Sequence, residues 1–211
     1  MRILQMVLGP VQTNCFILLD DAGKALVVDP ADNGERIVEI LNENHAQLDK
    51  ILLTHGHFDH IGGAYYLQTH TDAVTYIHEL DNELLADPDK NLSNTFQMVK
   101  SEKYYKVKAD VLVKEGDTIE FGGLTFTVLH TPGHSRGSCL YVADGLIFAG
   151  DTIFKGEIGR NDTYGGSWES QQESLKKINQ LEGDYTICPG HGENTTLAYE
   201  KEHNPYLRMV R

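Results

Sequence analysis

The sequence predicts an α/β fold, specifically an αββα sandwich of two packed mixed β-sheets with helices on both outer faces. A pattern of strands, helix, strand, helix occurs twice along the 211 residues, and the second half echoes the first. Each half offers one apolar sheet face, so packing the two faces together buries both. No linker rich in proline, glycine or serine separates the halves, and we therefore expect one domain over residues 1–211.

The first half contains five apolar runs typical of strands, over residues 3–8, 15–19, 25–28, 51–53 and 74–77. Three segments favour helices, near residues 35–44, 62–69 and 79–86. Asn33 is placed to cap the first of these helices. Apart from the third helix, residues 79–110 are polar and show no regular period.

The second half contains five further strand-like runs, over residues 118–121, 124–129, 139–142, 146–148 and 185–188. Gly122-Gly123 predicts a hairpin between the first two runs. A long helix is expected to begin after a cap at Ser167 and to end at Gly183. Its expected inner face is Trp168, Leu175, Ile178 and Leu181. A last helix is expected over about residues 195–203.

Composition and charge exclude several classes of partner. The chain has a formal net charge of −13, whereas nucleic-acid binding requires an excess of lysine and arginine. The same charge disfavours adhesion to anionic membranes.

The N-terminal apolar run is broken by Gln5 and stopped at Gly9-Pro10, unlike a signal peptide. Three widely spaced cysteines indicate a reducing compartment, and we expect a cytoplasmic protein. The sequence leaves the oligomeric state open.

The tract Thr54-His55-Gly56-His57-Phe58-Asp59-His60 places three histidines and an aspartate within six residues, directly after an apolar run. Imidazole nitrogens and carboxylate oxygens are preferred ligands of zinc and similar metals. Four donors so close together cannot all reach one ion without strain, but they can serve two neighbouring ions. His55 and His57 share a parity and can point one way, while Asp59 and His60 follow round the turn.

Three more candidate ligands each follow a predicted strand. His134 lies in Thr-Pro-Gly-His-Ser, Asp151 follows Gly150, and His191 lies in Pro-Gly-His-Gly. The glycines allow tight turns and close approach of the backbone to a metal. Because all three follow strand ends, we expect them to gather beside the histidine tract.

These residues resemble the motif set of the metallo-β-lactamase superfamily over almost the whole chain. The series His55-x-His57-x-Asp59-His60, then His134, Asp151 and His191, carries the resemblance. Within the superfamily the chain looks most like the short glyoxalase II-like hydrolases (hydroxyacylglutathione hydrolase-like). That closer likeness is carried by residues 150–154, 159–162 and 203–207.

The resemblance implies a centre of two Zn²⁺ ions per chain, with iron or manganese as alternatives. It assigns the ligands in two sets: His55, His57 and His134 to one ion, and Asp59, His60 and His191 to the other. Asp151 would bridge both ions together with a water or hydroxide, and Asp59 and Asp151 are the carboxylates expected to act in catalysis. Such a centre lowers the pKa of bound water from about 16 towards about 7.

The implied substrate is a small-molecule thioester, such as lactoylglutathione. Its thiol leaves readily as a thiolate because the thiol pKa is about 8.5. Longer glyoxalase II enzymes continue with a helical segment that grips glutathione, whereas this sequence stops at Arg211. Arg160 replaces their lysine and Asp162 their glutathione-binding tyrosine. Arg160, Asp162 and Lys155 are nevertheless candidate substrate contacts, although Arg160 is equally consistent with a structural ion pair to Asp162 or Glu157.

The same candidate ligands are also compatible with other functions. Members resembling persulfide dioxygenase hold one iron with a subset matching His55, His134 and Asp151. A non-catalytic, metal-stabilised binding protein is a second alternative. A secreted β-lactamase and a nuclease are both disfavoured, the first because no export signal is seen and the second by the negative charge. Phe58, Ile61 and Tyr164 are candidate walls of the site, and His130 is expected to be structural.

Overall fold

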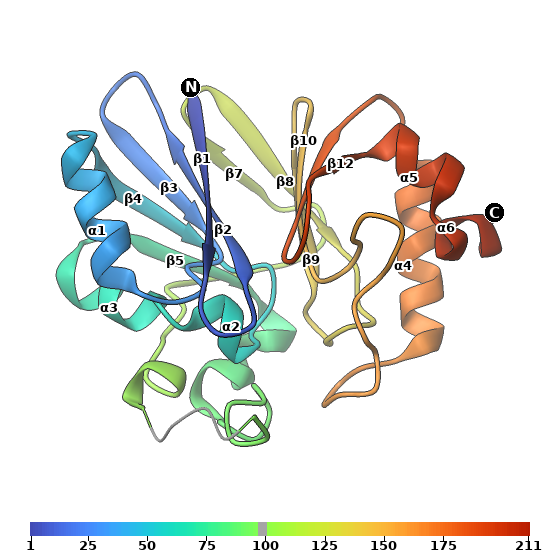
Figure 1. Ribbon diagram of the computed structural model, residues 1–211, viewed down its shortest axis with the longest axis horizontal. Coiled ribbons are helices and arrows are strands. Elements are labelled where there is room, and N and C mark those ends of the chain that lie inside the picture. Colours follow the sequence, from blue (N-terminus) through green and yellow to red (C-terminus); the bar gives the residue numbers. More distant parts are fainter. Residues whose placement is uncertain (97–100) are drawn as a thin grey trace.

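Two six-stranded β-sheets pack face to face, and helices cover the outer side of each sheet (Figure 1). The computed structural model describes residues 1–96 and 101–211. The helices α1 and α3 lie outside one sheet, and α4, α5 and α6 lie outside the other. This arrangement confirms the αββα fold that the sequence predicts.

The first sheet follows the order of the sequence: β1 (Arg2–Leu8), β2 (Thr13–Leu19), β3 (Lys24–Val28), β4 (Gln47–Leu52), β5 (Val74–His78) and β6 (Val111–Val113). Strands β1 to β3 pair antiparallel, whereas β3 to β6 pair parallel. The first two parallel connections pass through α1 (Gly34–Glu43), and through α2 (Phe58–Ile61) and α3 (Ala64–His70). Asn33 caps α1 as predicted, because its side chain accepts a hydrogen bond from the Arg36 N–H.

The second sheet has the order β12 (Thr195–Thr196), β11 (Thr186–Pro189), β10 (Leu146–Gly150), β9 (Cys139–Ala143), β8 (Leu124–His130) and β7 (Thr118–Phe121). Only the pair β10 and β11 is parallel. The outer helices are α4 (Trp168–Gln180), α5 (Leu197–His203) and α6 (Pro205–Met209). Ser167 caps α4 as predicted, accepting a hydrogen bond from the Ser170 N–H.

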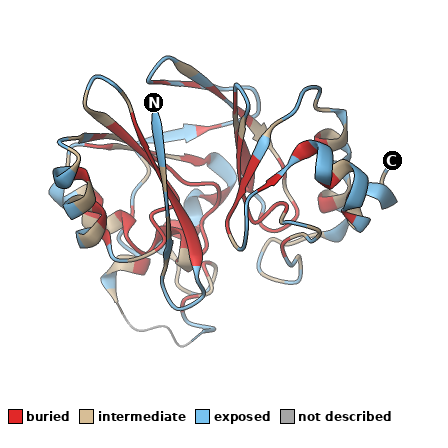
Figure 2. Ribbon diagram, turned by 45° about the horizontal axis from the view of Figure 1, so that its top comes forward, coloured by how far each residue is buried: buried red, intermediate tan, exposed pale blue. Residues whose placement is uncertain are grey.

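Alternating side chains along the strands build three apolar layers. In β2, Ile17 faces the outer helices, whereas Phe16 and Leu18 face the other sheet, where Phe126 and Phe148 lie. Buried residues are concentrated on the strands and on the inner sides of the helices (Figure 2). Each fully buried side chain of this size contributes about 1.5–3 kcal/mol, so the layers hold the strand ends in a fixed relation.

The structure corrects several predicted helix boundaries. The helix expected over residues 62–69 is α3, which begins only at Ala64, and a separate short helix, α2, precedes it and was not predicted; Gly62-Gly63 lies between the two. These glycines pass so close to the backbone of Pro30 and Ala31 that a side chain would clash. Residues 79–86 form a 3₁₀ helix, η1 (Glu79–Ala86), and a second one, η2, spans Glu102–Tyr104.

Further corrections concern the C-terminal half. α4 ends at Gln180 with Leu181 as its cap, before Gly183, and Trp168 is 37% exposed and not on the inner face. Residues 195–196 form a strand, so the last predicted helix begins at Leu197. β6 and α6 were not predicted. None of the helices in the described part of the chain has the length and apolar character needed to cross a membrane.

Candidate metal centre

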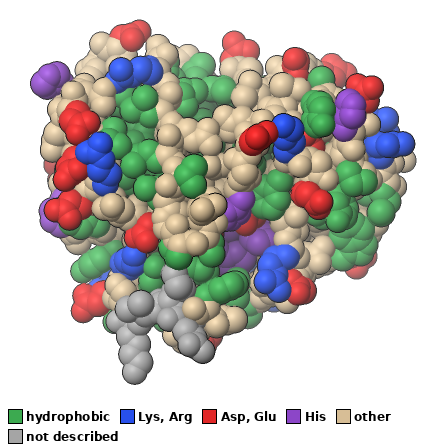
Figure 3. Space-filling view, in the orientation of Figure 1, with side chains coloured by type: hydrophobic (Ala, Val, Ile, Leu, Met, Phe, Trp, Pro, Cys, Tyr) green, Lys and Arg blue, Asp and Glu red, His purple; other side chains and the backbone are tan. Residues whose placement is uncertain are grey.

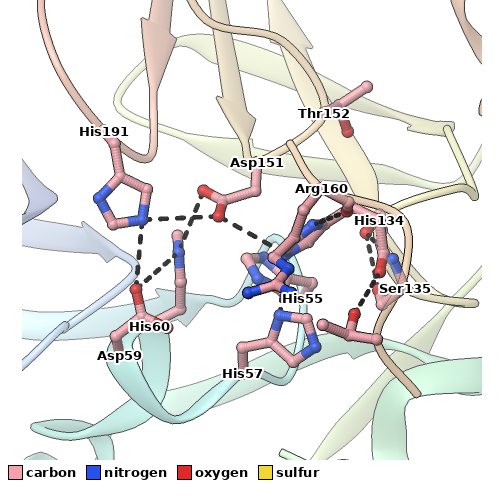
Figure 4. A network of polar contacts seen from close by, with 12 residues as sticks. His55, His57, Asp59, His60, His134, Ser135, Asp151, Thr152, Arg160 and His191 are labelled. Carbon is pink, nitrogen blue, oxygen red and sulfur yellow. Dashed lines mark hydrogen bonds and ion pairs between the residues drawn. The ribbon is translucent and has the colours of Figure 1, made fainter. Parts of the chain in front are cut away.

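The predicted ligands lie on loops that leave strands at one edge of the two sheets. β4 leads into the histidine tract, β8 into the loop of His134, β10 into Asp151, and β11 into the turn of His191. In Figure 4 the side chains from these four loops point toward one another. The space-filling view shows histidine side chains in a hollow on this face (Figure 3).

The first group consists of His55, His57 and His134, whose donor atoms all lie within 4.8 Å of one another. Nδ1 of His57 and Nε2 of His134 are 2.8 Å apart, and all three rings are buried. Burial, aided by the neighbouring His134, lowers the pKa of His57 to about 3. This imidazole is therefore neutral at physiological pH, as a metal ligand must be.

The second group consists of Asp59, His60 and His191, with donor atoms within the same distance of one another. The Asp59 Oδ2 atom lies 3.2 Å from His191 Nε2 and 3.5 Å from His60 Nε2. Burial alone would raise the pKa of Asp59, but His60 and His191 lower it to about 2. His191 is partly exposed, and although burial lowers its pKa, the carboxylates of Asp151 and Asp59 raise it to about 9.

Asp151 lies between the two groups (Figure 4). Its Oδ1 atom is 3.2 Å from His60 Nε2, and its Oδ2 atom is 3.5 Å from both His134 Nε2 and His191 Nε2. It also forms a third close set of donors with His55 and His60. One carboxylate thus faces ligands of both groups.

The residues present fit a metal centre. Within the described ranges, four buried donor atoms of these groups have no hydrogen-bond partner: His55 Nε2, His57 Nε2, His60 Nε2 and Asp151 Oδ1. Leaving buried polar atoms unsatisfied costs free energy unless something else binds them. Nitrogen and carboxylate donors suit zinc, iron or manganese, so ions held at these groups would satisfy Nε2 of His55, Nε2 of His60 and Oδ1 of Asp151, whereas His57 faces His134 through Nδ1.

Asp29 fixes the second group and was missed by the sequence analysis. Its carboxylate accepts hydrogen bonds from the Thr54 N–H at 2.8 Å and the Thr54 hydroxyl at 2.7 Å, and it lies 2.9 Å from His60 Nδ1. The contact with Nδ1 leaves Nε2 of His60 facing the centre. The only signal in the sequence was that Asp29 ends a strand, like the ligands themselves.

Asp81 fixes the first group through the backbone and was also missed. This fully buried carboxylate, in η1, accepts hydrogen bonds from the Gly56 N–H at 3.0 Å, the Ser135 hydroxyl at 2.7 Å and the Gly137 N–H at 2.6 Å. Gly56 separates His55 from His57, and Ser135 follows His134. Asp81 therefore ties together the two loops that supply the first group.

Two glycines are required by close approach, as the sequence analysis expected of glycines near the ligands. Gly150 has a φ of +47°, and a Cβ there would lie 2.2 Å from the Thr54 hydroxyl oxygen. A Cβ on Gly190 would lie 2.2 Å from Oδ1 of Asp151. These positions bring Asp151 and the turn of His191 against the histidine tract.

A cavity of about 140 Å³ opens onto both groups. It is lined by Val11, His57, Phe58, Asp59, Leu92, Phe96, His134, Asp151, Arg160 and His191. A larger hollow of about 440 Å³ lies beside α1 and α3, but the candidate ligands adjoin the smaller one. The donor atoms rather than the size of a hollow therefore locate the site.

The predicted substrate contacts are only partly gathered at this cavity. Arg160 lines it, and the Arg160 backbone oxygen lies 2.6 Å from His134 Nδ1. Its guanidinium makes two hydrogen bonds to Asp162, at 2.7 and 2.9 Å, so the predicted structural ion pair is present. Lys155 pairs with the exposed Glu193 at 2.6 Å.

Of the predicted wall residues, only Phe58 lines the cavity. Ile61 is fully buried in the core beneath α1 and α3, so its prediction as a wall residue is wrong. The hydroxyl of Tyr164 donates to Glu83, away from the ligands. His130 stacks on His78 and lies 2.8 Å from the Arg136 carbonyl oxygen, which agrees with a structural role.

Comparison with known proteins identifies the family. The family model described as the metallo-beta-lactamase superfamily matches residues 8–191, a span that contains every candidate ligand. The chain belongs to this superfamily. The match confirms the resemblance seen in the sequence, and it supports metal binding by the two groups described above.

Two curated relatives within the superfamily match nearly the full length of the chain. A probable metallo-hydrolase of Bacillus subtilis, YqgX, is 34% identical over 210 residues, which cover 98% of both chains. The hydroxyacylglutathione hydrolase GloC of Haemophilus influenzae is 31% identical over 199 residues, 93% of both chains. These relatives agree with a metallo-hydrolase and are consistent with the glyoxalase II-like subgroup.

Three solved structures share the fold. The B3 metallo-beta-lactamase BLEG-1 is 34% identical with a TM-score of 0.91, covering 98% of this chain and 99% of that one. TTHA1623, solved in a di-iron-bound form, is 31% identical with a TM-score of 0.85, covering 96% and 99%. ETHE1 of Myxococcus xanthus is 25% identical with a TM-score of 0.79, covering 100% and 90%. The di-iron form of TTHA1623 leaves zinc and iron both open for this chain.

Proposed function

We propose that this metallo-hydrolase cleaves thioesters, and that its substrates are 2-hydroxyacyl thioesters such as lactoylglutathione. The observation that carries the proposal is the pair of donor groups that lie on either side of Asp151 beside one cavity. The similarity to GloC, a hydroxyacylglutathione hydrolase, favours the same substrate class. Three free, buried cysteines agree with a cytoplasmic location, which is part of the proposal.

In this proposal the first ion is held by His55, His57 and His134, and the second by Asp59, His60 and His191. Asp151 faces both groups. When bound, two divalent ions polarise a carbonyl and lower the pKa of bound water from about 16 to about 7. We infer zinc, with iron or manganese able to occupy the same donors.

The chain's own groups orient this chemistry. The Thr13 hydroxyl donates to Oδ2 of Asp59 at 2.7 Å, and Asp29 lies against Nδ1 of His60, so both side chains are held in place. Asp59 and Asp151 remain ionised next to the histidines, since the pKa values of both carboxyl groups are lowered. A thiolate departs without a strong general acid because the pKa of its thiol is about 8.5. Among oxygen and sulfur esters, this favours the thioester.

The test combines elemental analysis with a panel of thioesters. Protein purified without added metal is analysed for zinc, iron and manganese, and its hydrolysis of lactoylglutathione and of simpler acyl thioesters is measured. The proposal expects hydrolysis that is lost in His57→Ala and retained in His203→Ala, an exposed histidine on α5. Oxygen uptake with glutathione persulfide, without thioester hydrolysis, would identify the mononuclear iron alternative instead.

Hydrolysis of a β-lactam ring is a second candidate, favoured by the similarity to BLEG-1. A β-lactam is an amide, whose nitrogen is a poorer leaving group than a thiolate. The same preparations are therefore assayed with a chromogenic cephalosporin. A kcat/KM higher for the cephalosporin than for every thioester would replace the thioesterase proposal with this one.

A further inference from the structure

The cavity has four apolar lining residues, which the proposed metal ligands do not explain. Val11, Phe58, Leu92 and Phe96 line it together with the metal-donor side chains, and Arg160 is its cationic member. Phe58 is buried against Tyr104 and Phe96, with ring centroids 5.9 and 5.3 Å away. The cavity therefore offers apolar contacts next to the metal-donor side chains.

Leu92, one of these four residues, holds an unusual backbone conformation. Its φ is +69°, in the left-handed region, which favours glycine, asparagine and aspartate. The other non-glycine residues with positive φ in the described part of the chain are polar: Gln12, Asp29, Asn33 and His45. A leucine in this conformation costs free energy, and residues of this kind persist where their surroundings hold them and often where they serve function.

The residues on either side of Leu92 hold it in this conformation. The Asn91 side-chain amide donates to the carbonyl oxygens of Leu84 and Tyr104, at 2.9 and 2.6 Å. Its Oδ1 atom accepts from the Ser93 N–H at 3.1 Å, which bridges across Leu92. The Asn91 backbone oxygen accepts from the Phe58 N–H at 2.9 Å. Leu92 therefore cannot relax without breaking bonds that also anchor the first turn of α2.

The size of the cavity indicates which part of a thioester meets Leu92. At about 140 Å³ it is well below the roughly 300–1,000 Å³ that encloses a drug-sized ligand. A carrier such as glutathione exceeds this volume and must extend outside the cavity. The short acyl group is the part that fits.

We propose that Leu92 is a specificity-determining residue that limits the length of the acyl group. The inference rests on the proposed thioesterase function and adds its substrate class, namely short acyl groups on a carrier that remains outside. Leu92 is one of the apolar residues that line the cavity, and in this proposal its side chain fills space that a longer acyl chain would need. Removing it lengthens the acceptable chain, and enlarging it shortens that chain.

The test uses the metal-loaded protein and acyl thioesters of N-acetylcysteamine with acetyl, butyryl, hexanoyl and octanoyl chains. Wild type is expected to prefer the short chains. In Leu92→Ala the ratio of kcat/KM for hexanoyl to that for acetyl should rise about tenfold or more, the discrimination that a methylene or two gives in an apolar pocket. Leu92→Phe should shift the ratio the opposite way, and Leu112→Ala, an exposed leucine on β6, should leave it unchanged.

A binding measurement separates this inference from the proposed function. Calorimetry measures the affinity of the matching straight-chain carboxylates for the same loaded proteins, whether or not a thioester is hydrolysed. The same chain-length shift in Leu92→Ala supports the inference even if hydrolysis is absent, in which case the thioesterase proposal alone fails. An unchanged chain-length profile in both Leu92 variants overturns the inference. The inference is also overturned if no protein hydrolyses a thioester and none binds a carboxylate measurably.

Discussion

The two donor groups at the strand ends differ in chemistry, exposure and support. The first has three buried imidazoles, and Asp81 supports it through the backbone and Ser135. The second includes the carboxylate of Asp59 and the partly exposed His191, and Asp29 supports it by direct contact with a ligand ring. The comparison teaches that two neighbouring donor groups can be held in different ways. In the first, hydrogen bonds fix the loops that carry the ligands, and in the second, a hydrogen-bonding partner fixes a ligand side chain directly.

Asp151 is where the two groups meet, so its loss should have the largest effect. In this account, Asp151→Ala removes a donor from both groups. Removal of a residue that only hydrogen-bonds to a metal ligand already lowers metal affinity about 10–100-fold. We expect affinity for both ions to fall by more than about a hundredfold, and hydrolysis to fall further than in His57→Ala or His191→Ala. Metal content and kcat/KM are measured together, with the exposed Asp144→Ala as control. Near-normal binding of two ions by Asp151→Ala would show that this carboxylate is not shared.

The supporting carboxylates should separate the two groups. Asp29→Asn removes the charge next to His60 Nδ1, and we expect affinity for one ion to fall about 10–100-fold while the other ion is retained. Asp81→Asn disturbs two N–H donors and a hydroxyl, and should cost about 2 kcal/mol of stability, or about 6 °C in Tm. Zinc titrations and thermal melts of both metal-free variants check these outcomes. If the affinity for both ions falls equally in Asp29→Asn, Asp29 does not support the second group alone.

Replacement of Arg160, which lines the cavity beside the two donor groups, should have a smaller effect on activity. If its guanidinium binds a substrate carboxylate, Arg160→Ala should raise KM about tenfold with little change in kcat, the loss of one charge-assisted contact. Asp162→Asn is the matched variant, since it frees the guanidinium from its present ion pair. Steady-state kinetics that show the same KM in wild type and Arg160→Ala would leave only the structural role.

The pKa values predict the smallest effect, in the metal-free protein. The pKa of His57 lies near 3 when folded, below its usual value near 6.5, so stability should decrease as the pH falls from 6.5. The pKa of His191 lies near 9 when folded, so its contribution is complete below pH 6.5 and is lost as the pH rises through 9. Each slope is at most about 4 °C in Tm per pH unit. His60, whose pKa is also raised, adds to the alkaline decrease. Melts of His191→Gln should therefore show a smaller alkaline decrease and an unchanged acidic one, and loss of the acidic decrease instead would contradict the assignment.

Local patterns in the sequence predicted ten of the twelve strands, the two capped helices and the seven candidate donors, because apolar periodicity and strand-end loops are local signals. Asp81 could not be predicted, since its partners Ser135 and Gly137 lie more than fifty positions away in the chain. The positive φ of Leu92 depends in the same way on contacts from Asn91 to Tyr104. β6 was missed because it has three residues and pairs only with β5. Supporting contacts of this kind are properties of the fold rather than of any short segment.

Titration of the metal-free protein with zinc, followed by calorimetry and elemental analysis, tests most directly whether two donor groups share Asp151. The account predicts close to two ions per chain, an affinity for both ions that is more than about a hundredfold weaker in Asp151→Ala, and an affinity for one ion that is about 10–100-fold weaker in Asp29→Asn. Saturation of well-folded wild-type protein at one ion, with Asp59 and His191 unbound in its structure, would contradict it.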